Sequence, residues 1–310
     1  MDLDGDGIGD IITGSWPGEL YFFKGKGKGE FAAAVKLQDT KGKDIKLGSA
    51  STVFAADWRG TGKLDLLVGN IQGEVLLVPN KGEPRHHAFG APLKLAAGGQ
   101  MIKAGHGDSH PIAADWDRDG KLDLIVAGGD GSVTFYRNIG SKTEPKLAKG
   151  VTLVKAASSP NLNDEAPPPK EATPGMRAKI CVVDWNGDGH LDLLLGDFGM
   201  SYGPKPKLTE ADKKIEKEAN ARLQESRKKL QPFFDEYFKR LNDGARPDEP
   251  AEAKQEREKK AQEVLSRKEF QAVQAEQTKI YETIRRFQRP FSYSGNVWLY
   301  LRKPPAAAAR

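Results

Sequence analysis

The feature that most constrains this chain is a nine-residue acidic loop that occurs four times, each time directly before a short apolar run. The fourth copy, residues 184–192, has acidic or amide side chains at loop positions one, three, five and nine, and glycines at positions four and six. At intervals of 55, 58 and 69 residues, the copies begin with Asp2, Asp57, Asp115 and Asp184. A repeat of nearly constant period indicates the fold class before any local propensity does.

The loop has the composition of a site for a hard cation. Ca²⁺ takes about six to eight oxygen ligands around a tight turn, and alternate Asp and Asn side chains supply them. Glycine permits the positive φ that such a turn requires. In an EF-hand a Glu follows at position twelve and the chain continues as a helix. Position twelve of the fourth copy is instead Leu195, in an apolar run that ends in glycine and predicts a buried strand.

Each copy predicts a unit of up to four short strands, one entering the loop and one leaving it. The entering strands are expected at residues 52–56, 111–114 and 180–183. Third strands, each after a glycine turn, are expected at 19–23, 74–78, 132–136 and 296–301. Fourth strands are expected at 34–37, 92–95 and 151–154. Antiparallel strands in this number, with no helix between copies, are typical of a propeller blade.

The phrase DxDGDGxxDhhhG and the glycine-led strand after it resemble the FG-GAP/VCBS repeat family, the integrin-α-like β-propellers. The resemblance covers residues 1–201 and 292–303. It implies a mainly β chain forming a four-bladed β-propeller, with Ca²⁺ held in the loops between the first and second strands of the blades. It also implies an extracellular, periplasmic or cell-surface location and a role in binding or adhesion.

The resemblance implies about three calcium sites. The ligands carried over to the first loop are Asp2, Asp4, Asp6, the Ile8 carbonyl and Asp10. Those of the third loop are Asp115, Asp117, Asp119, the Lys121 carbonyl and Asp123. Those of the fourth loop are Asp184, Asn186, Asp188, the His190 carbonyl and Asp192. The alternative for each loop is an Asp-rich turn that binds nothing.

The second loop departs from this pattern, because Arg59 and Thr61 replace two carboxylates. Arg59 brings a positive charge to the place of the ion. We therefore expect the second loop to be free of metal.

A charged insert separates the second and third strands of the last copy. Apolar residues at helical spacing predict a helix that begins with a cap at Thr209 and ends near Asn242, with Pro232 expected to kink or split it. A second helix is expected from about Pro250 to Gln288, which makes an antiparallel helical hairpin. The expected domains are a propeller over 1–203, the hairpin over 204–291, the last strand over 292–303 and a disordered tail over 304–310.

The first copy has no strand before its loop, and the last copy has no fourth strand. We therefore expect the propeller to be truncated at its N-terminus in this sequence. The natural chain would begin upstream of Met1, where an export signal is also expected.

The residue directly after the first aspartate is Trp58, Trp116 or Trp185 in three of the copies. This identical placement predicts packing against a neighbouring blade. Cys181 lies in an apolar strand and is expected to be a small buried hydrophobe.

The sequence favours a calcium-stabilised propeller that binds a protein or glycan, without catalysis, on the face opposite the calcium loops. The net charge of +5 is dispersed, which is evidence against nucleic-acid binding, and no run of 18 apolar residues suggests a membrane span. Two alternatives stay open. One is a structural protein that self-associates through the helical hairpin, and the other is a propeller-based polysaccharide lyase or hydrolase.

The enzyme alternative would use polar side chains of that opposite face. The available side chains are Asp39, Asp44, His106, Asp108 and His110. The histidine pairs His86–His87 and His106…His110 lie in loops and lack the spacing of a metalloprotease motif, so they are expected to be solvated.

Overall fold

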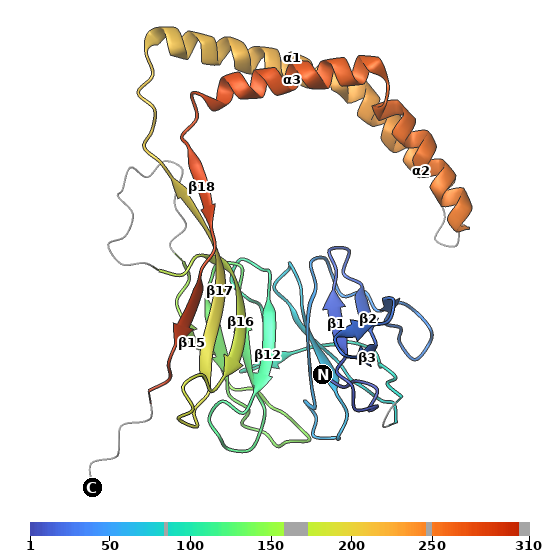
Figure 1. The fold of residues 1–310 in the computed structure, drawn as a ribbon. Helices are drawn as coiled ribbons and strands as arrows, with labels where there is room; N and C mark the ends of the chain where they lie inside the picture. The colour runs from blue at the N-terminus through green and yellow to red at the C-terminus, as the bar shows by residue number, and fades with distance from the viewer. Residues whose placement is uncertain (84–85, 158–172, 246–249, 304–310) are drawn as a thin grey trace. The chain divides into compact units, whose positions relative to one another are not determined.

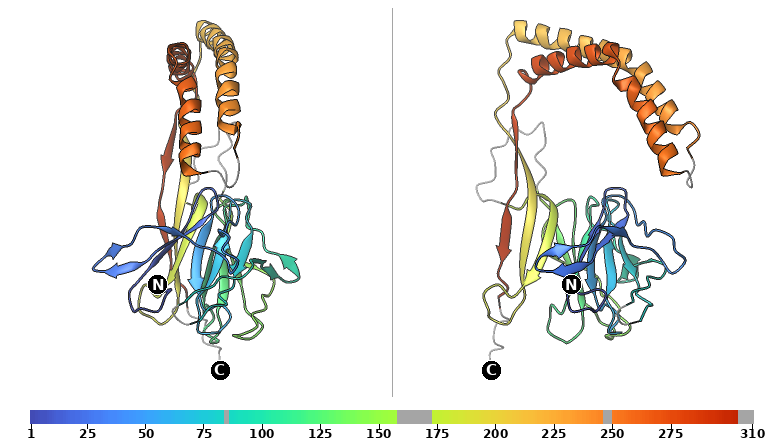
Figure 2. Two further views of the ribbon diagram at one scale, coloured as in Figure 1. Left: turned by 90° about the vertical axis from the view of Figure 1, so that its right-hand side faces the viewer. Right: turned by 45° about the vertical axis from the view of Figure 1, so that its right-hand side comes forward.

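The computed structural model describes residues 1–83, 86–157, 173–245 and 250–303 and forms two compact units. The first unit is Met1–Ser201 with Tyr293–Arg310, and the second is Tyr202–Ser292. The first unit consists of antiparallel β-sheets and the second of helices (Figures 1 and 2).

Four antiparallel sheets of three or more strands lie in the described part of the chain, one for each acidic loop. Sheet 1 has the order β1 (Ile11–Gly14), β2 (Leu20–Phe23), β5 (Val35–Lys36). Sheet 2 has the order β6 (Thr52–Ala56), β7 (Asp65–Gly69), β8 (Val75–Val78), β9 (Leu93–Lys94). Sheet 3 has the order β12 (His110–Ala114), β13 (Asp123–Ala127), β14 (Val133–Tyr136), β15 (Val151–Val154).

Sheet 4 is formed by β16 (Met176–Val183), β17 (Asp192–Tyr202) and β19 (Val297–Tyr300), and β17 also pairs with β18 (Phe291–Ser294). Two short ribbons complete the strands. They are β3 (Gly25–Gly27) with β4 (Glu30–Phe31), and β10 (Ala96–Ala97) with β11 (Gln100–Met101). Each strand predicted from the repeat is present, and β16 and β17 are longer than predicted. The chain is mainly β, and its sheets are consistent with a β-propeller-like fold.

The sheets pack on one another in chain order. Successive side chains of a strand point to opposite faces, so one strand can contact the sheet before it and the sheet after it. In β7, Leu66 and Val68 share a buried cluster with Ile12 of sheet 1. Leu67, between them, belongs to the next cluster and packs with Leu124 of sheet 3. A central sheet is therefore apolar on both faces.

The same rule holds for every copy. The residue ten positions after the first aspartate faces the following sheet, and its two neighbours face the preceding sheet. The residues that face the following sheet in this way are Ile12, Leu67 and Ile125. Those that face the preceding sheet are Leu66, Val68, Leu124, Val126, Leu193 and Leu195.

The tryptophans follow this rule, with one difference from the prediction. Trp58 is 3% exposed between sheets 2 and 3, and Trp116 is 9% exposed between sheets 3 and 4. Trp185 is 60% exposed, so its predicted packing against a neighbouring sheet is wrong. Cys181 is also exposed, contrary to the prediction. Cys181 pairs with Leu194, on the side where a following sheet would lie, and Trp185 occupies the loop position of Trp58 and Trp116. The described part of the first unit has no further sheet after sheet 4.

The second unit contains α1 (Glu210–Asn242), α2 (Ala251–Leu265) and α3 (Lys268–Arg285). The predicted capping box is present, since Thr209 and Asp212 bond to each other's backbone N–H. Helix α1 packs along both α2 and α3, so a hairpin is formed. Leu223 of α1 is buried in one cluster with Ile280 and Ile284 of α3.

The predicted second helix is wrong in one respect, because it is broken at Ser266–Arg267 into α2 and α3. Helix α1 continues through Pro232 without being split, and Figure 1 shows that it is bent. Close to this proline in the sequence, Glu236 accepts hydrogen bonds of 2.6 and 2.7 Å from Arg267. The Phe270 ring lies 5.6 Å from that of Phe234. The break therefore lets the second arm of the hairpin follow the bend of α1.

The predicted tail, 304–310, lies outside the described residues. Among the described helices, none combines the length and the hydropathy that crossing a membrane requires.

The packing rule predicts that replacing each of the three tryptophans by alanine lowers the free energy of unfolding by a different amount. Trp58→Ala and Trp116→Ala should each lower the free energy of unfolding by about 3–5 kcal/mol, because each leaves a cavity between two sheets. Trp185→Ala should cost less than about 1 kcal/mol in dilute protein, because its side chain faces solvent. Urea unfolding followed by circular dichroism measures all three. An equal loss for Trp185→Ala would contradict the rule.

Candidate metal sites

The first aspartate of each loop folds the loop by accepting backbone hydrogen bonds. Asp2 accepts from the backbone N–H of Asp6 at 3.1 Å and of Gly7 at 2.9 Å. In the second loop Asp57 accepts in the same way from Thr61 at 2.7 Å and Gly62 at 2.8 Å. The second loop therefore keeps the shape of the others although it has lost two carboxylates.

The ninth-position aspartate ties each loop to the end of the third strand. The four aspartates at this position are at most 4% exposed: Asp10, Asp65, Asp123 and Asp192. Burying a carboxylate is costly unless hydrogen bonds replace its water. Asp123 accepts from the backbone N–H of Trp116 at 3.1 Å, inside the loop, and of Asn138 at 2.7 Å, beyond β14.

The first and fourth copies repeat this bridge, whereas in the second copy the loop half of the bridge comes from the Arg59 side chain. Asp10 accepts from the backbone N–H of Leu3 and of Gly25, both at 2.8 Å. Asp192 accepts from Trp185 at 3.0 Å and from Arg302 at 2.8 Å. The sequence analysis assigned these aspartates only as metal ligands, and it missed their role in holding the sheet.

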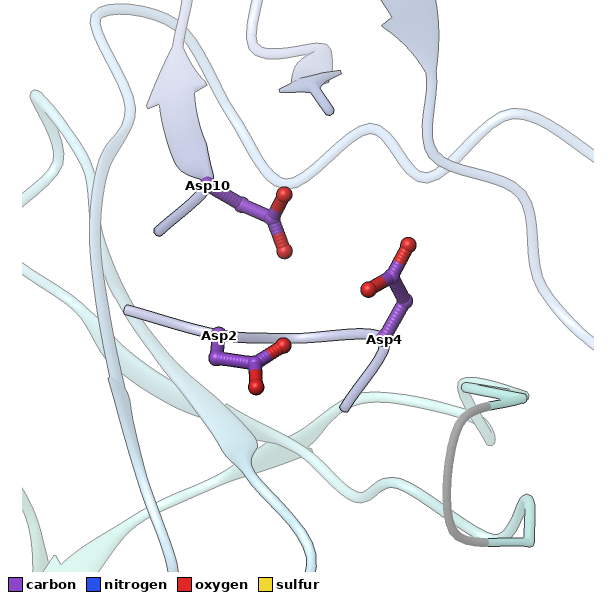
Figure 3. Close-up of side chains that lie close together, drawn as sticks. All are labelled: Asp2, Asp4 and Asp10. Carbon is purple, nitrogen blue, oxygen red and sulfur yellow. The ribbon is translucent and has the colours of Figure 1, made fainter. Parts of the chain in front are cut away.

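In the first loop three carboxylates gather around one point. Oxygen atoms of Asp2, Asp4 and Asp10 lie within 4.8 Å of one another, and Figure 3 shows the three side chains directed toward a common centre. Asp6 lies beside them, and its carboxylate is 2.8 Å from the Lys24 ammonium group.

The third loop has the equivalent group, since oxygen atoms of Asp115, Asp117 and Asp123 also lie within 4.8 Å of one another. Oδ1 of Asp115 is buried and has no hydrogen-bond partner. Burial raises the pKa of Asp123, and the neighbouring charge of Asp117 raises it further. A cation at this point would supply the missing partner and offset the repulsion between the carboxylates.

Basic side chains from the third strands also contact these loops. Lys24 pairs with Asp4 and Asp6, and these two carboxylates raise the pKa of its ammonium group. Arg137 pairs with Asp117 at 2.5 Å and with Asp119 at 3.4 Å. The sequence analysis missed both residues. The sequence feature that could have identified them is their shared position: each stands 22 residues after the first aspartate of its copy.

The second loop carries its own cation. The Arg59 guanidinium donates to both oxygens of buried Asp65, at 3.1 and 2.8 Å, and to the Asn80 carbonyl at 3.0 Å. Arg59 thus contacts the ninth-position carboxylate that an ion would ligate. That this loop binds no metal stays a prediction.

The fourth loop is folded as the others are, although it is not one of the two groups of three carboxylates found in the described residues. Asp184 accepts from the backbone N–H of Asp188 and Gly189, at 3.1 and 2.9 Å. Asn186 takes the place of a carboxylate and donates through its amide to Asp188 at 2.9 Å. The fourth site stays a prediction, as do the carbonyl ligands at Ile8, Lys121 and His190.

Two of the aspartates considered for catalysis have structural partners. Asp39 accepts from the backbone N–H of Lys41 and Lys43, at 2.8 and 3.0 Å. Asp108 pairs with Arg177 at 2.9 Å and with Lys179 at 3.0 Å.

Two of the histidines predicted to be solvated are packed. His110 is the first residue of β12 and accepts from the backbone N–H of Ile180 at 3.1 Å. Burial, together with the charge of Lys179, lowers the pKa of His110 to about 4. The ring of His87 lies 5.4 Å from that of Phe22 and 5.3 Å from that of Phe89. The prediction is therefore wrong for His87 and His110.

Comparison with known proteins agrees with the repeat seen in the sequence. Residues 2–68 and 115–195 match the family described as FG-GAP-like repeat. These two regions contain all four acidic loops. No curated protein matches the chain.

The contact of Lys24 with the first loop predicts that this lysine weakens ion binding there. Lys24→Met should raise the calcium affinity of the first loop by about two- to fivefold, because the ion no longer displaces an ammonium group from Asp4. Calorimetric calcium titration in an Asp119→Ala, Asp188→Ala background isolates the first loop. Lys26→Met is the control for net charge, and an equal gain in that control would contradict a specific contact.

Proposed function

Because its β unit carries FG-GAP-like repeats, we propose that this chain is a calcium-stabilised, extracellular propeller module that binds a protein or glycan partner without catalysis. The observation that carries the proposal is the arrangement of charged side chains in the loops. Loops one and three each gather three carboxylates around one point, while loop two carries an arginine on its buried carboxylate. This pattern supports a cation as a structural part of the other loops.

The residues present fit Ca²⁺ better than a softer metal. All the side-chain donors of the gathered groups are carboxylate oxygens, the ligands that hard cations prefer. Asp2, Asp4 and Asp10 would hold one ion, and Asp115, Asp117 and Asp123 another. The fourth loop would hold a third through Asp184, Asn186, Asp188 and Asp192. The ion would neutralise the loop and fix the connection between two strands.

Sheets 1–4 are proposed to be four propeller blades, with domains at 1–203 and 292–303 for the propeller and 204–291 for the helical hairpin. Antiparallel strand order places the acidic loops at one end of the sheets and the connections between consecutive sheets at the other. That second end is the proposed partner face.

Backbone geometry supports this assignment of the partner face. A positive φ is uncommon for residues other than glycine and often marks functional segments. Four of the six such residues lie at this end: Ala50 between sheets 1 and 2, His106 and Asp108 between sheets 2 and 3, and Arg177 at the start of sheet 4. The other two are Lys28, between β3 and β4, and Arg118, in the third acidic loop.

Calcium should raise the melting temperature, and chelation with EGTA should lower it. An ion that binds only the folded state adds about 2.7 kcal/mol per site at a hundredfold excess over its Kd. Asp119→Ala and Asp188→Ala should each remove about one bound ion, counted by elemental analysis after gel filtration, whereas Thr61→Ala should leave the count unchanged. A melting temperature that does not change with calcium would contradict the proposal.

The second loop offers a test by gain of function. The double substitution Arg59→Asp, Thr61→Asp restores the acidic pattern. In EGTA this variant should lose about 3 kcal/mol of stability, because buried Asp65 loses its guanidinium partner. Calcium should recover much of that loss. Arg59→Ala is the matched control: it loses the same partner and gains no ligand, so calcium should not rescue it any more than the wild type. Equal behaviour of the two variants would contradict the proposed role of the loop.

A further inference from the structure

Sheet 4 has an apolar face that no sheet of the first unit covers, within the residues that the structure describes. Val297 is 74% exposed and Leu299 is 42% exposed on β19. Strand register joins Leu299 to Leu194 on β17, and Leu194 to exposed Cys181 on β16. Trp185, in the adjoining loop, is 60% exposed. The face is therefore continuous across all three strands.

The same positions are buried in the sheets before it. Leu194 stands ten residues after its first aspartate, as Leu67 and Ile125 do, and those two are fully buried against the following sheet. Trp185 corresponds to buried Trp58 and Trp116. Sheet 4 thus presents the surface that sheets 2 and 3 use to pack on another sheet of this repeat.

Sheet 1 presents the other half of that interface. Ile11 is 40% exposed, and Thr13 is also exposed. These positions correspond to Leu66 and Val68 of sheet 2, which are buried against the preceding sheet. On the neighbouring strand Phe23 pairs with Ile11, so the exposed side of sheet 1 is a continuous face as well.

We propose that the two faces join in solution, with sheet 4 of one copy packing on sheet 1 of a second copy. A second copy is the partner because the chain carries both halves of the interface. Within one copy they lie at opposite ends of the series of sheets (Figures 1 and 2). The contact continues, between chains, the packing that joins sheets 1, 2, 3 and 4 within the chain. It is a head-to-tail contact, which closes into a ring or extends into a filament.

Light scattering coupled to gel filtration, over a range of protein concentrations, tests this proposal on the full chain. The wild type should exceed the mass of one chain. Val297→Glu and Ile11→Glu should each give a monomer, because each places a charge in one half of the interface. Both side chains are exposed in the single copy, so folding should be retained, which circular dichroism and the melting temperature check. Met101→Glu alters a residue that is 65% exposed on β11, outside both faces, and should associate as the wild type does.

Mixing the two monomeric variants identifies the geometry. The Val297→Glu chain keeps a normal sheet 1, and the Ile11→Glu chain keeps a normal sheet 4, so an equal mixture should regain a dimer through one intact interface. A mixture that stays monomeric would overturn the head-to-tail contact. So would an Ile11→Glu chain that still associates alone, since sheet 4 would then pair with itself. A wild type that is monomeric at every concentration, or variants that associate normally, would overturn the proposal altogether.

Discussion

The structure depends on a buried carboxylate at the ninth position of each acidic loop. In the first, third and fourth copies this aspartate accepts from a backbone N–H within the loop and from one beyond the third strand, at Gly25, Asn138 or Arg302. In the second copy Asp65 accepts from the Arg59 side chain within the loop and from the Asn80 backbone N–H beyond the third strand. One side chain thereby joins three consecutive strands of a sheet. A carboxylate with no water around it needs both these hydrogen bonds and a compensating charge. The rest of the loop can be understood as the means of providing that charge.

The positive charge near the carboxylates of the loop differs between the copies. Arg59 places a permanent positive charge beside Asp65 in the second loop. In the first and third loops, Lys24 and Arg137 contact the exposed carboxylates at positions three and five. They reach the loops from neighbouring strands, where they offset negative charge without contacting the ninth-position aspartate.

Sheet packing follows from the same repeat. Each copy places apolar residues on both faces of its central strand, so a sheet is complete only between two neighbours. Sheets 2 and 3 have both neighbours, and their tryptophans are buried. In the described part of the first unit sheet 4 has one, and Trp185 and Cys181 are exposed. Local sequence cannot reveal this difference, because Trp185 occupies the same position in its copy as Trp58 does.

The sequence by itself determined the strands, their order within each sheet and the acidic pattern of the loops, because all three follow from a periodic signal with alternating burial. It also identified the odd loop, since Arg59 replaces a ligand within the motif. Tertiary structure decided what depends on neighbours distant in sequence. The break at Ser266–Arg267 accompanies a bend in α1 and the pairing of Arg267 with Glu236, 31 residues earlier. Lys24 reaches Asp4 only because the third strand returns to the loop. Burial of His110 depends on Ile180, 70 residues away, so its own loop-like surroundings in the sequence were misleading.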